Sequence, residues 1–293
     1  MTAHRPPRWL VDLSLASVAL IWGATFVLVK RALDDVSTLL FLAIRFALAT
    51  AALLFVFRKQ LRSPDLSRAL RGGTIAGACL FAGYVFQTFG LKYTSAAKTG
   101  FITGLYIPLV PLFSSLIYRR LPQLAEIAGV ATAFAGLTLM TVERDLMSLS
   151  LGDLLVAGCA VAYAFHILVL GRYAQAGATG TLVVVQIATA GLLSAGTFWW
   201  AEPVRIKWSG NVWIALAVTS LLATALAFAV QTWGQRWSSP TRTALIFSME
   251  PVFAWGTSYL MAGELLSRRA TVGEALILAG IVLVELKPAW SRS

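Results

Sequence analysis

Charged residues are scarce in this chain of 293 residues, and their scarcity excludes an ordinary soluble domain. Only 13% of the residues are Asp, Glu, Lys or Arg, whereas 58% are hydrophobic. Soluble domains carry about 25% charged residues, because the apolar atoms on their surface must be interspersed with groups that water solvates. The composition therefore predicts an integral membrane protein.

Residues that carry enzyme chemistry are also few. The chain has two cysteines and two histidines. Cys79 and Cys159 form no Cys-x-x-Cys or Cys/His cluster, so we expect both to be buried small apolar residues. The sequence contains no His-Glu-x-x-His, no Gly-x-Ser-x-Gly and no Gly-x4-Gly-Lys-Ser/Thr motif. Metal catalysis, nucleophilic catalysis and ATP hydrolysis thus lack their usual residues. We expect neither an enzyme nor a bound cofactor or metal.

Long apolar stretches, in contrast, fill nearly the whole chain. A helix of about 20 apolar residues crosses the roughly 30 Å of hydrocarbon in a bilayer. Such stretches lie at 10–31, 37–57, 71–92, 96–118, 121–142, 150–172, 180–200, 211–236, 241–262 and 270–287. They lack the period-2 alternation of membrane β-strands. The prediction is an all-α membrane protein with ten transmembrane helices.

The second half of the chain repeats the first. At an offset of 141 residues, Asp12-Leu13 recurs as Asp153-Leu154, and at 144 residues Gln87-Thr88-x-Gly90 recurs as Gln231-Thr232-x-Gly234. Because each copy has five spans, an odd number, the second copy must enter the membrane from the opposite side. We predict two inverted five-helix repeats, over 10–142 and 150–287. Inverted repeats are typical of secondary transporters, whose substrate site lies at the repeat interface near the bilayer midplane.

The formal net charge of +11 reflects topology and does not indicate nucleic acid binding. The basic residues lie at the ends of the spans and form no single stripe. The side that holds both termini carries more of them, most densely in the loop 58–71, so both termini are predicted to be cytoplasmic. The first apolar run continues past the length of a signal peptide into Lys30-Arg31, so we expect it to remain as the first span.

Two charged residues are predicted to lie inside the membrane, where an ionised side chain costs several kcal/mol unless it is paired or reaches water. Arg45 falls in the second span, and its repeat mate Gln186 is neutral. It could snorkel or anchor a neighbouring helix, or it could contact substrate. Glu250 precedes Pro251, which exposes a backbone carbonyl. It could act as a proton carrier, as the partner of an ammonium group or as a structural residue.

Aromatic and amide residues recur together at helical spacing. Tyr84 and Gln87 lie three residues apart on one face of the third span, and the repeat places Phe228 and Gln231 on the eighth. Glutamines in such positions either bond neighbouring helices or line a cavity, and both alternatives fit. The expected apolar part of a cavity consists of Trp22, Tyr84, Tyr106, Tyr163 and Phe228. Such a chamber can stack apolar rings and contact amines.

His166 is the one histidine within the predicted spans, on the same face as Tyr163. A histidine can carry a proton near neutral pH, but the pattern favours cavity lining without proton transfer. Two spans also show interruptions. Pro108 and Pro111 break the fourth and Pro251 the ninth, and paired interruptions in corresponding spans point to a transport site. At the starts of these spans we expect Lys98 and Arg242 to be interfacial anchors, the alternative being attraction of a carboxylate.

With these residues the chain resembles the ten-helix EamA-type members of the drug/metabolite transporter superfamily. The segments that carry the resemblance are Trp22-Gly23-Ala24-Thr25-Phe26, Ala43-Ile44-Arg45-Phe46, Gly90-Leu91-Lys92-Tyr93-Thr94-Ser95-Ala96, Glu250-Pro251-Val252-Phe253 and Gly263-Glu264. One departure is Arg120 at the position that matches Glu264. The resemblance implies a central cavity between the halves, alternating access and cytoplasmic termini. The chain is most similar to bacterial exporters of aromatic and other hydrophobic amino acids, which implies a multi-pass protein of the bacterial inner membrane.

We therefore predict a secondary transporter that exports small amphipathic metabolites, above all aromatic and other hydrophobic amino acids. The predicted substrate-binding residues are Trp22, Tyr84, Gln87, Tyr106, Tyr163, His166, Phe228, Gln231 and Glu250. Arg45 and Glu250 are also candidates for a coupling or structural charge. The alternative cargo is a nucleoside, a sugar or a drug-like compound. Expected partners are the small-molecule substrate and the lipid bilayer, with no nucleic acid, and a monomer is the expected state.

Overall fold

The computed structural model describes an α-helical membrane protein over residues 5–62, 66–94, 96–119, 121–141, 150–176, 178–250, 252–253 and 268–285. Within these residues, six helical spans are long and apolar enough to cross a membrane: Arg8–Ala32, Thr38–Phe57, Leu66–Tyr93, Leu151–Tyr173, Thr179–Ala201 and Gly210–Gln235. Shorter apolar helices lie at Tyr106–Tyr118, Ile127–Gly136 and Thr271–Gly280. The predicted all-α membrane fold is confirmed. In the predicted ninth span, Pro251 and residues 254–262 lie outside the described residues, as do Gly263-Glu264 and Arg120.

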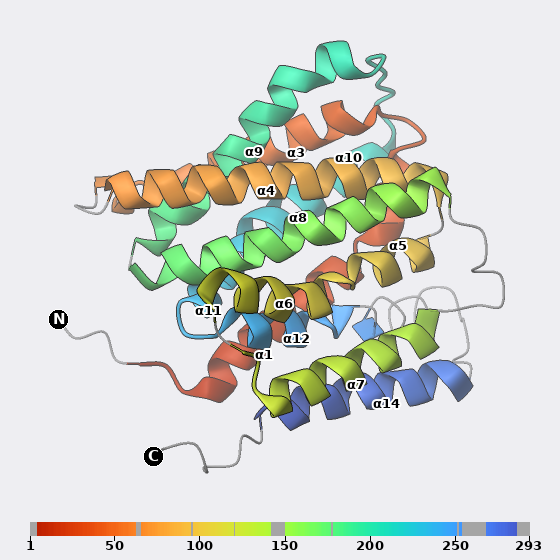
Figure 1. The fold of residues 1–293 in the computed structure, drawn as a ribbon. Helices are drawn as coiled ribbons and strands as arrows, with labels where there is room; N and C mark the ends of the chain where they lie inside the picture. The colour runs from red at the N-terminus through yellow and green to blue at the C-terminus, as the bar shows by residue number, and fades with distance from the viewer. Residues whose placement is uncertain are drawn as a thin grey trace.

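The helices follow one another in the same order in the two halves (Figure 1). The first half contains α1 (Arg8–Gly23), α2 (Phe26–Ala32), α3 (Thr38–Phe57), α4 (Leu66–Tyr93), α5 (Ala96–Thr103), α6 (Tyr106–Tyr118) and α7 (Leu124–Thr141). The second half contains α8 (Leu151–Tyr173), α9 (Thr179–Ala201), α10 (Gly210–Ser220), the π-helical segment η3 (Leu221–Leu226), α11 (Ala227–Gln235), α12 (Pro240–Phe247) and α14 (Arg268–Glu285). Helix α12 begins and ends 144 residues after α5, and α14 begins and ends 144 residues after α7.

The contact between α7 and α14 shows how the halves are related. A Cβ atom added to Gly136 would lie 2.4 Å from the carbonyl oxygen of Gly273, and one added to Gly280 would lie 2.5 Å from that of Gly129. Gly129 and Gly273 are repeat mates, as are Gly136 and Gly280. Exchanging the two halves therefore converts one contact into the other, so an approximate two-fold axis relates α7 and α14. The later glycine of each helix meets the earlier glycine of the other, so the two helices are antiparallel. The halves are duplicated and inverted.

Two apolar clusters form the interior. One contains buried side chains of α1, α6, α7, α8 and α12, and the other contains those of α2, α3, α4, α9 and α10. The repeat mates Trp22 and Tyr163 pack against both clusters. Each cluster combines helices from both halves, so neither half has a core of its own. The space between the clusters is where the site lies.

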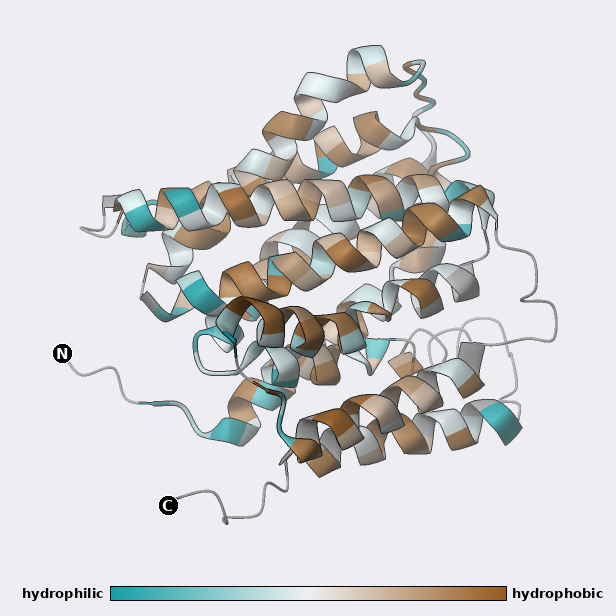
Figure 2. Cartoon of the chain, in the orientation of Figure 1, coloured by the Kyte–Doolittle hydropathy of each residue, from teal (hydrophilic) through white to brown (hydrophobic). Residues whose placement is uncertain are grey.

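The outer surface is suited to lipid. Large apolar side chains such as Phe55 (73% exposed) and Leu116 (77%) face outward, and Figure 2 shows hydrophobic residues along the helices with hydrophilic ones toward their ends. Exposed tryptophans gather around the end of α9 and the start of α10, where Trp208 and Trp213 stack at 4.7 Å. Aromatic residues in that position are typical of the membrane–water interface. Of the two cysteines, Cys159 is buried and Cys79 is half-buried.

Ion pairs link helices near both ends of the bundle. Arg242 donates from Nε to Asp12 Oδ1 (2.9 Å) and from Nη2 to Asp12 Oδ2 (2.5 Å), so the start of α12 is held to α1. The cation predicted to be an interfacial anchor thus binds a carboxylate of the protein itself. Beyond the far end of α9, Glu202 accepts from the backbone N–H of Leu39 and pairs with Lys92 at 3.4 Å. The side chain of Lys98 lies outside the described residues.

We expect Gly136→Ala to destabilise the protein, because its methyl group would overlap a backbone carbonyl of α14 that cannot move aside without separating the helices. Overpacking of this kind costs about 1–3 kcal/mol. The matched control is Gly196→Ala in α9, where an added Cβ meets nothing within 4 Å. Thermal unfolding of the detergent-solubilised variants would measure the effect. Equal melting temperatures for the two variants would contradict the close α7–α14 contact.

Candidate functional site

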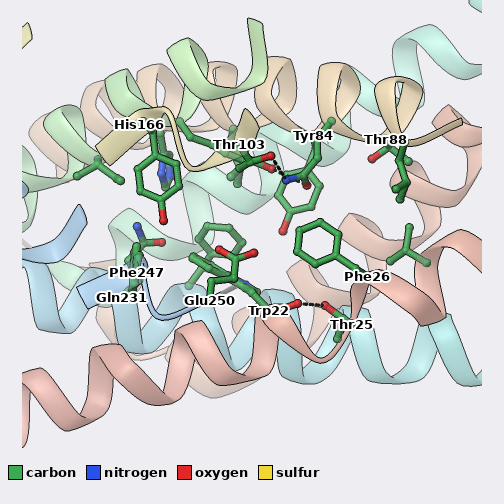
Figure 3. Close-up of a pocket in the computed structure, with 18 of the residues that line it drawn as sticks. Trp22, Thr25, Phe26, Tyr84, Thr88, Thr103, His166, Gln231, Phe247 and Glu250 are labelled. Atoms are coloured by element: carbon green, nitrogen blue, oxygen red, sulfur yellow. Dashed lines mark hydrogen bonds between the residues drawn. The ribbon is translucent and has the colours of Figure 1, made fainter. Parts of the chain in front are cut away.

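A cavity with about 740 Å³ of empty volume, open solvent included, lies between the two halves and is lined by aromatic, aliphatic and polar side chains (Figure 3). All nine residues predicted to bind substrate line it, and so does Arg45: Trp22, Arg45, Tyr84, Gln87, Tyr106, Tyr163, His166, Phe228, Gln231 and Glu250. The structure adds residues that the pattern did not select, among them Phe26, Val29, Leu80, Leu91 and Ile167. These are ordinary apolar residues of spans, and nothing in their spacing distinguishes them from lipid-facing neighbours.

Two interrupted helices meet at the cavity. α5 ends at Thr103 and α6 begins at Tyr106, and in the second half α12 ends at Phe247 and the chain is helical again at Glu250. Tyr106 and Glu250 are repeat mates, so each begins the segment that follows a break. Discontinuous helices of this kind form the substrate and ion sites of many secondary transporters.

The predicted position of the break in the fourth span was wrong. It was placed at Pro108 and Pro111, but the turn comprises residues 104 and 105, before both prolines. Proline is tolerated in the first turn of a helix, where its missing N–H would have no intrahelical partner. Pro108 occupies that turn of α6. Pro111 lies inside α6, where the chain stays helical.

Two other irregularities of the backbone each occur in one half and have no counterpart in the other. The first span is interrupted between α1 and α2, at Ala24 and Thr25, whereas its repeat mate α8 is continuous. The eighth span contains the π-helical turn η3, whereas its mate α4 is regular. π-Helical turns are rare and frequently occur at functional sites. The sequence of η3, Leu-Leu-Ala-Thr-Ala-Leu, gives no local signal for this irregularity.

Two side chains of the first half donate hydrogen bonds to the π-helical turn. Trp22 Nε1 donates to the carbonyl oxygen of Ala223 at 2.8 Å, and Arg45 Nε donates to Thr224 Oγ1 at 2.8 Å. A π-helical turn widens the helix and leaves backbone groups outside the regular α-helical ladder. The two contacts therefore place the irregular turn of the second half against the first half, at the wall of the cavity.

Arg45 is 4% exposed and joins three elements. Besides Thr224, it contacts Tyr84, whose hydroxyl oxygen accepts from Nη2 at 3.0 Å and whose ring centre lies 4.6 Å from the guanidinium carbon. Arg45 thus bonds two neighbouring helices, with hydroxyl groups as acceptors. Within the described residues no carboxylate lies within ion-pair distance of its guanidinium, so its charge faces the cavity without a fixed counter-ion.

The repeat mate of Arg45 is also an interhelical anchor. Gln186 accepts from His166 Nε2 at 2.9 Å and donates to Thr232 Oγ1 at 2.9 Å. The Thr232 hydroxyl donates its proton to the carbonyl oxygen of Phe228 (2.6 Å), so it can only accept from Gln186. The Gln186 oxygen must then face His166, whose Nε2 carries a proton. This chain fixes the orientation of the imidazole in the cavity wall.

The repeat mates Gln87 and Gln231 are bonded differently. Gln87 accepts from the Tyr163 hydroxyl at 3.3 Å and donates to Thr103 Oγ1 at 3.2 Å, so both ends of its amide have partners. Gln231 donates from Nε2 to Gln235 Oε1 at 3.1 Å. Its own Oε1 is buried and has no hydrogen-bond partner among the described residues. The pair that is symmetric in sequence is therefore asymmetric in chemistry.

Glu250 brings a carboxyl group to the cavity. Figure 3 shows it directed toward the middle of the cavity, between Gln231 on one side and Phe26 and Tyr84 on the other. No described residue donates a hydrogen bond to it. A buried carboxyl without a partner is costly, so it must meet water, a proton or a cationic ligand in the cavity.

The aromatic residues form a continuous wall around these polar groups. Trp22 contacts Phe228 and Phe247, with ring centroids 5.3 and 5.1 Å apart. Tyr84 contacts Tyr163 at 5.9 Å and Phe228 at 6.3 Å. The angled arrangements keep ring faces and edges available to a ligand ring. Among the described residues no group of His, Cys, Asp and Glu is arranged to hold a metal ion.

Inverted halves, broken helices and a cavity between them are the features of a membrane transporter. The model of the EamA-like transporter family matches residues 9–142 and 150–286, so the chain belongs to this family. A protein of Archaeoglobus fulgidus described as an uncharacterized transporter is 34% identical over 280 residues, which cover 96% of this chain and 87% of that protein. The Bacillus subtilis protein described as uncharacterized transporter YyaM is 25% identical over 287 residues, 93% of this chain and 92% of its own length. A solved crystal structure has the same fold, with a TM-score of 0.78 and 22% identity over 96% of this chain and 98% of that one.

We expect Gln186→Leu to destabilise the protein, because it would leave the buried His166 N–H without its acceptor and remove the bond from Gln186 to Thr232. Each buried unsatisfied group costs about 1–3 kcal/mol. Thr197→Val is the control in the same helix, since Thr197 bonds only to carbonyls of α9 itself. Thermal unfolding should show a clearly lower melting temperature for Gln186→Leu. The same small change in both variants would show that the hydrogen-bond chain contributes nothing to stability.

Proposed function

We propose that this transporter exports small amphipathic metabolites, with aromatic and other hydrophobic amino acids as its main substrates. The observation that carries the proposal is an aromatic cavity that also holds one cation without a fixed counter-ion, Arg45, and one carboxyl without a protein donor, Glu250. A zwitterion with an apolar side chain has matching groups of each kind. Substrate binding by the nine lining residues predicted from sequence forms part of this proposal.

The polarity of the cavity argues against more highly charged cargo. A phosphorylated metabolite or a nucleotide sugar brings two or more negative charges into the interior of the membrane, and each needs a cationic partner. Among the described residues that line the cavity, Arg45 is the one cation. An amino acid, in contrast, adds no net charge, and its ring can replace water against Trp22 and Phe228. Neutral nucleosides and drug-like compounds are the competing cargo, because they too present flat apolar rings.

Transport by alternating access suits the inverted halves, which we take as 10–142 and 150–287 in a bacterial inner membrane with both termini cytoplasmic. The bidentate contact between Asp12 and Arg242 holds α1 to α12 near the end of the bundle where α1 begins. The cavity, which Thr25, Phe26 and Val29 help to line, lies farther along the same span. We propose that this ion pair closes the cytoplasmic side and must break when the cavity opens there.

Counterflow in liposomes that contain the purified protein tests the substrate class. We expect labelled phenylalanine, tyrosine, tryptophan and leucine to exchange, and nucleosides and sugars to remain outside. Protein-free liposomes give the background. An imposed pH gradient would show whether a proton is coupled, because a facilitated pathway responds only to the substrate gradient. Exchange of nucleosides or sugars, and of no hydrophobic amino acid, would overturn the proposal.

The ion pair gives a separate prediction about access. We expect Asp12→Arg to increase labelling of a single cysteine placed at Ile167 by a reagent added from the cytoplasmic side, because repulsion from Arg242 would favour the open state. The double variant Asp12→Arg, Arg242→Asp restores the opposite charges and should reduce labelling again. The comparison requires a background in which Cys79 and Cys159 are replaced by serine. Equal labelling of the single and double variants would remove the pair from the closure of this side.

A further inference from the structure

We infer that Gln231 and Glu250 form a subsite for a primary ammonium group in the wall that the second half contributes to the cavity. This inference rests on the proposed function, because it names the substrate group that one wall of the cavity holds. It also goes beyond that function, since it assigns the two ends of the substrate to different halves of the protein.

The free acceptor on Gln231 does not depend on how its amide is assigned. The carbonyl oxygen of Ile167 can only accept, and it lies 2.9 Å from Gln235 Nε2, which fixes Gln235 with its Oε1 toward Gln231. Gln231 must then present its NH₂ group to that oxygen, at 3.1 Å. Its Oε1 is left without a donor, although the residue is only 1% exposed. The backbone carbonyl of Ile167, which is linked to Gln231 through two hydrogen bonds, thus determines which atom of Gln231 lacks a partner.

Glu250 supplies the second acceptor and the charge. It lines the same cavity as Gln231, at the start of the helical segment that follows the break, and has no donor among the described residues. In Figure 3 Gln231 is the labelled amide on one side of Glu250, which points toward the middle of the cavity. A carboxylate and an amide oxygen offer acceptors only, so the complementary ligand is a group with several N–H donors and a positive charge. A primary ammonium meets both requirements, whereas a hydroxyl group has one donor and no charge.

The first half has no equivalent subsite. The mate of Gln231 is Gln87, whose oxygen is occupied by the Tyr163 hydroxyl. The mate of Glu250 is Tyr106, which is neutral. The cation of the cavity, Arg45, belongs to the first half and uses Nε and Nη2 for its protein contacts. Its remaining donors suit a carboxylate. The ammonium end of an amino acid is therefore bound by the second half and the carboxylate end by the first.

The test is competition against labelled phenylalanine in proteoliposomes by three analogues of similar size. Phenethylamine lacks the carboxylate, 3-phenylpropionate lacks the amino group, and N-acetylphenylalanine has the amino group blocked. Losing a charged hydrogen bond of about 1.5–3 kcal/mol corresponds to about 10–100-fold in affinity. We expect 3-phenylpropionate and N-acetylphenylalanine to compete about 10–100-fold more weakly than unlabelled phenylalanine, because both lack the ammonium group.

The matched variants are Gln231→Leu and Gln60→Leu, which remove the same amide from the cavity wall and from an exposed residue outside it. We expect Gln231→Leu to reduce the ratio of phenethylamine affinity to 3-phenylpropionate affinity at least fivefold, and Gln60→Leu to leave this ratio within twofold of the unmodified protein. Glu250→Gln should reduce the ratio as well. The ratio is measured on one preparation, so a variant with less folded protein still gives a valid value. Gln231→Met, with a volume close to glutamine, replaces Gln231→Leu if the latter does not fold.

Two results would overturn the subsite: competition by 3-phenylpropionate equal to that by unlabelled phenylalanine, or an equal change of the ratio in Gln231→Leu and Gln60→Leu. Failure of the proposed function has a different signature, namely no exchange of any amino acid. In that case, binding of phenethylamine to the purified protein is followed by the change in tryptophan fluorescence, to which Trp22 in the cavity wall contributes. Saturable binding that is weakened in Gln231→Leu supports the subsite, and no binding contradicts it.

Discussion

The absence of water from the interior of a bilayer is the constraint on which this structure depends. Every polar group placed there must find a partner in the protein or face a cavity, because an unsatisfied group costs several kcal/mol. Arg45 and Gln186 satisfy the constraint by joining three helices each. Gln231 Oε1 and Glu250 do not satisfy it within the described residues, and both lie at the cavity. Other buried groups of the described residues also lack a partner, but these two lie at the cavity, where a ligand can reach them.

The frame around the cavity follows the symmetry of the duplication, and the cavity itself departs from it. Close packing of α7 on α14 depends on glycines that occur at matching positions in both halves. The breaks after Thr103 and Phe247 also match. The break between α1 and α2 and the π-helical turn η3 each occur in one half only, and Trp22 and Arg45 connect them to the other half. Symmetric contacts hold the halves together, whereas the irregular backbone accompanies the polar residues of the site.

Much of this could be predicted from sequence, for identifiable reasons. Apolar length determines the spans, and the repeat determines which residues face one another across the two-fold axis. Tyr84 and Gln87 were found because residues three apart share a helix face. Other features depend on tertiary context. The π-helical turn has an ordinary apolar sequence, and the turn before Tyr106 precedes the prolines that were expected to cause it. The unlike bonding of Gln87 and Gln231 depends on Tyr163, Thr103 and Gln235, which no spacing rule connects to them.

The asymmetry of the site bears on how an inverted transporter handles a polar substrate. If both halves offered the same groups, an amino acid would bind equally well in two opposite orientations. The aromatic mates Trp22/Tyr163 and Tyr84/Phe228 cannot separate these orientations, because a ring meets similar neighbours in either one. The charges can separate them, since Arg45 has the neutral mate Gln186 and Glu250 has the neutral mate Tyr106. Duplication can therefore give the transporter two similar conformations, open to opposite sides of the membrane. One unlike residue in each half, Arg45 and Glu250, then fixes a single orientation of the substrate in the cavity.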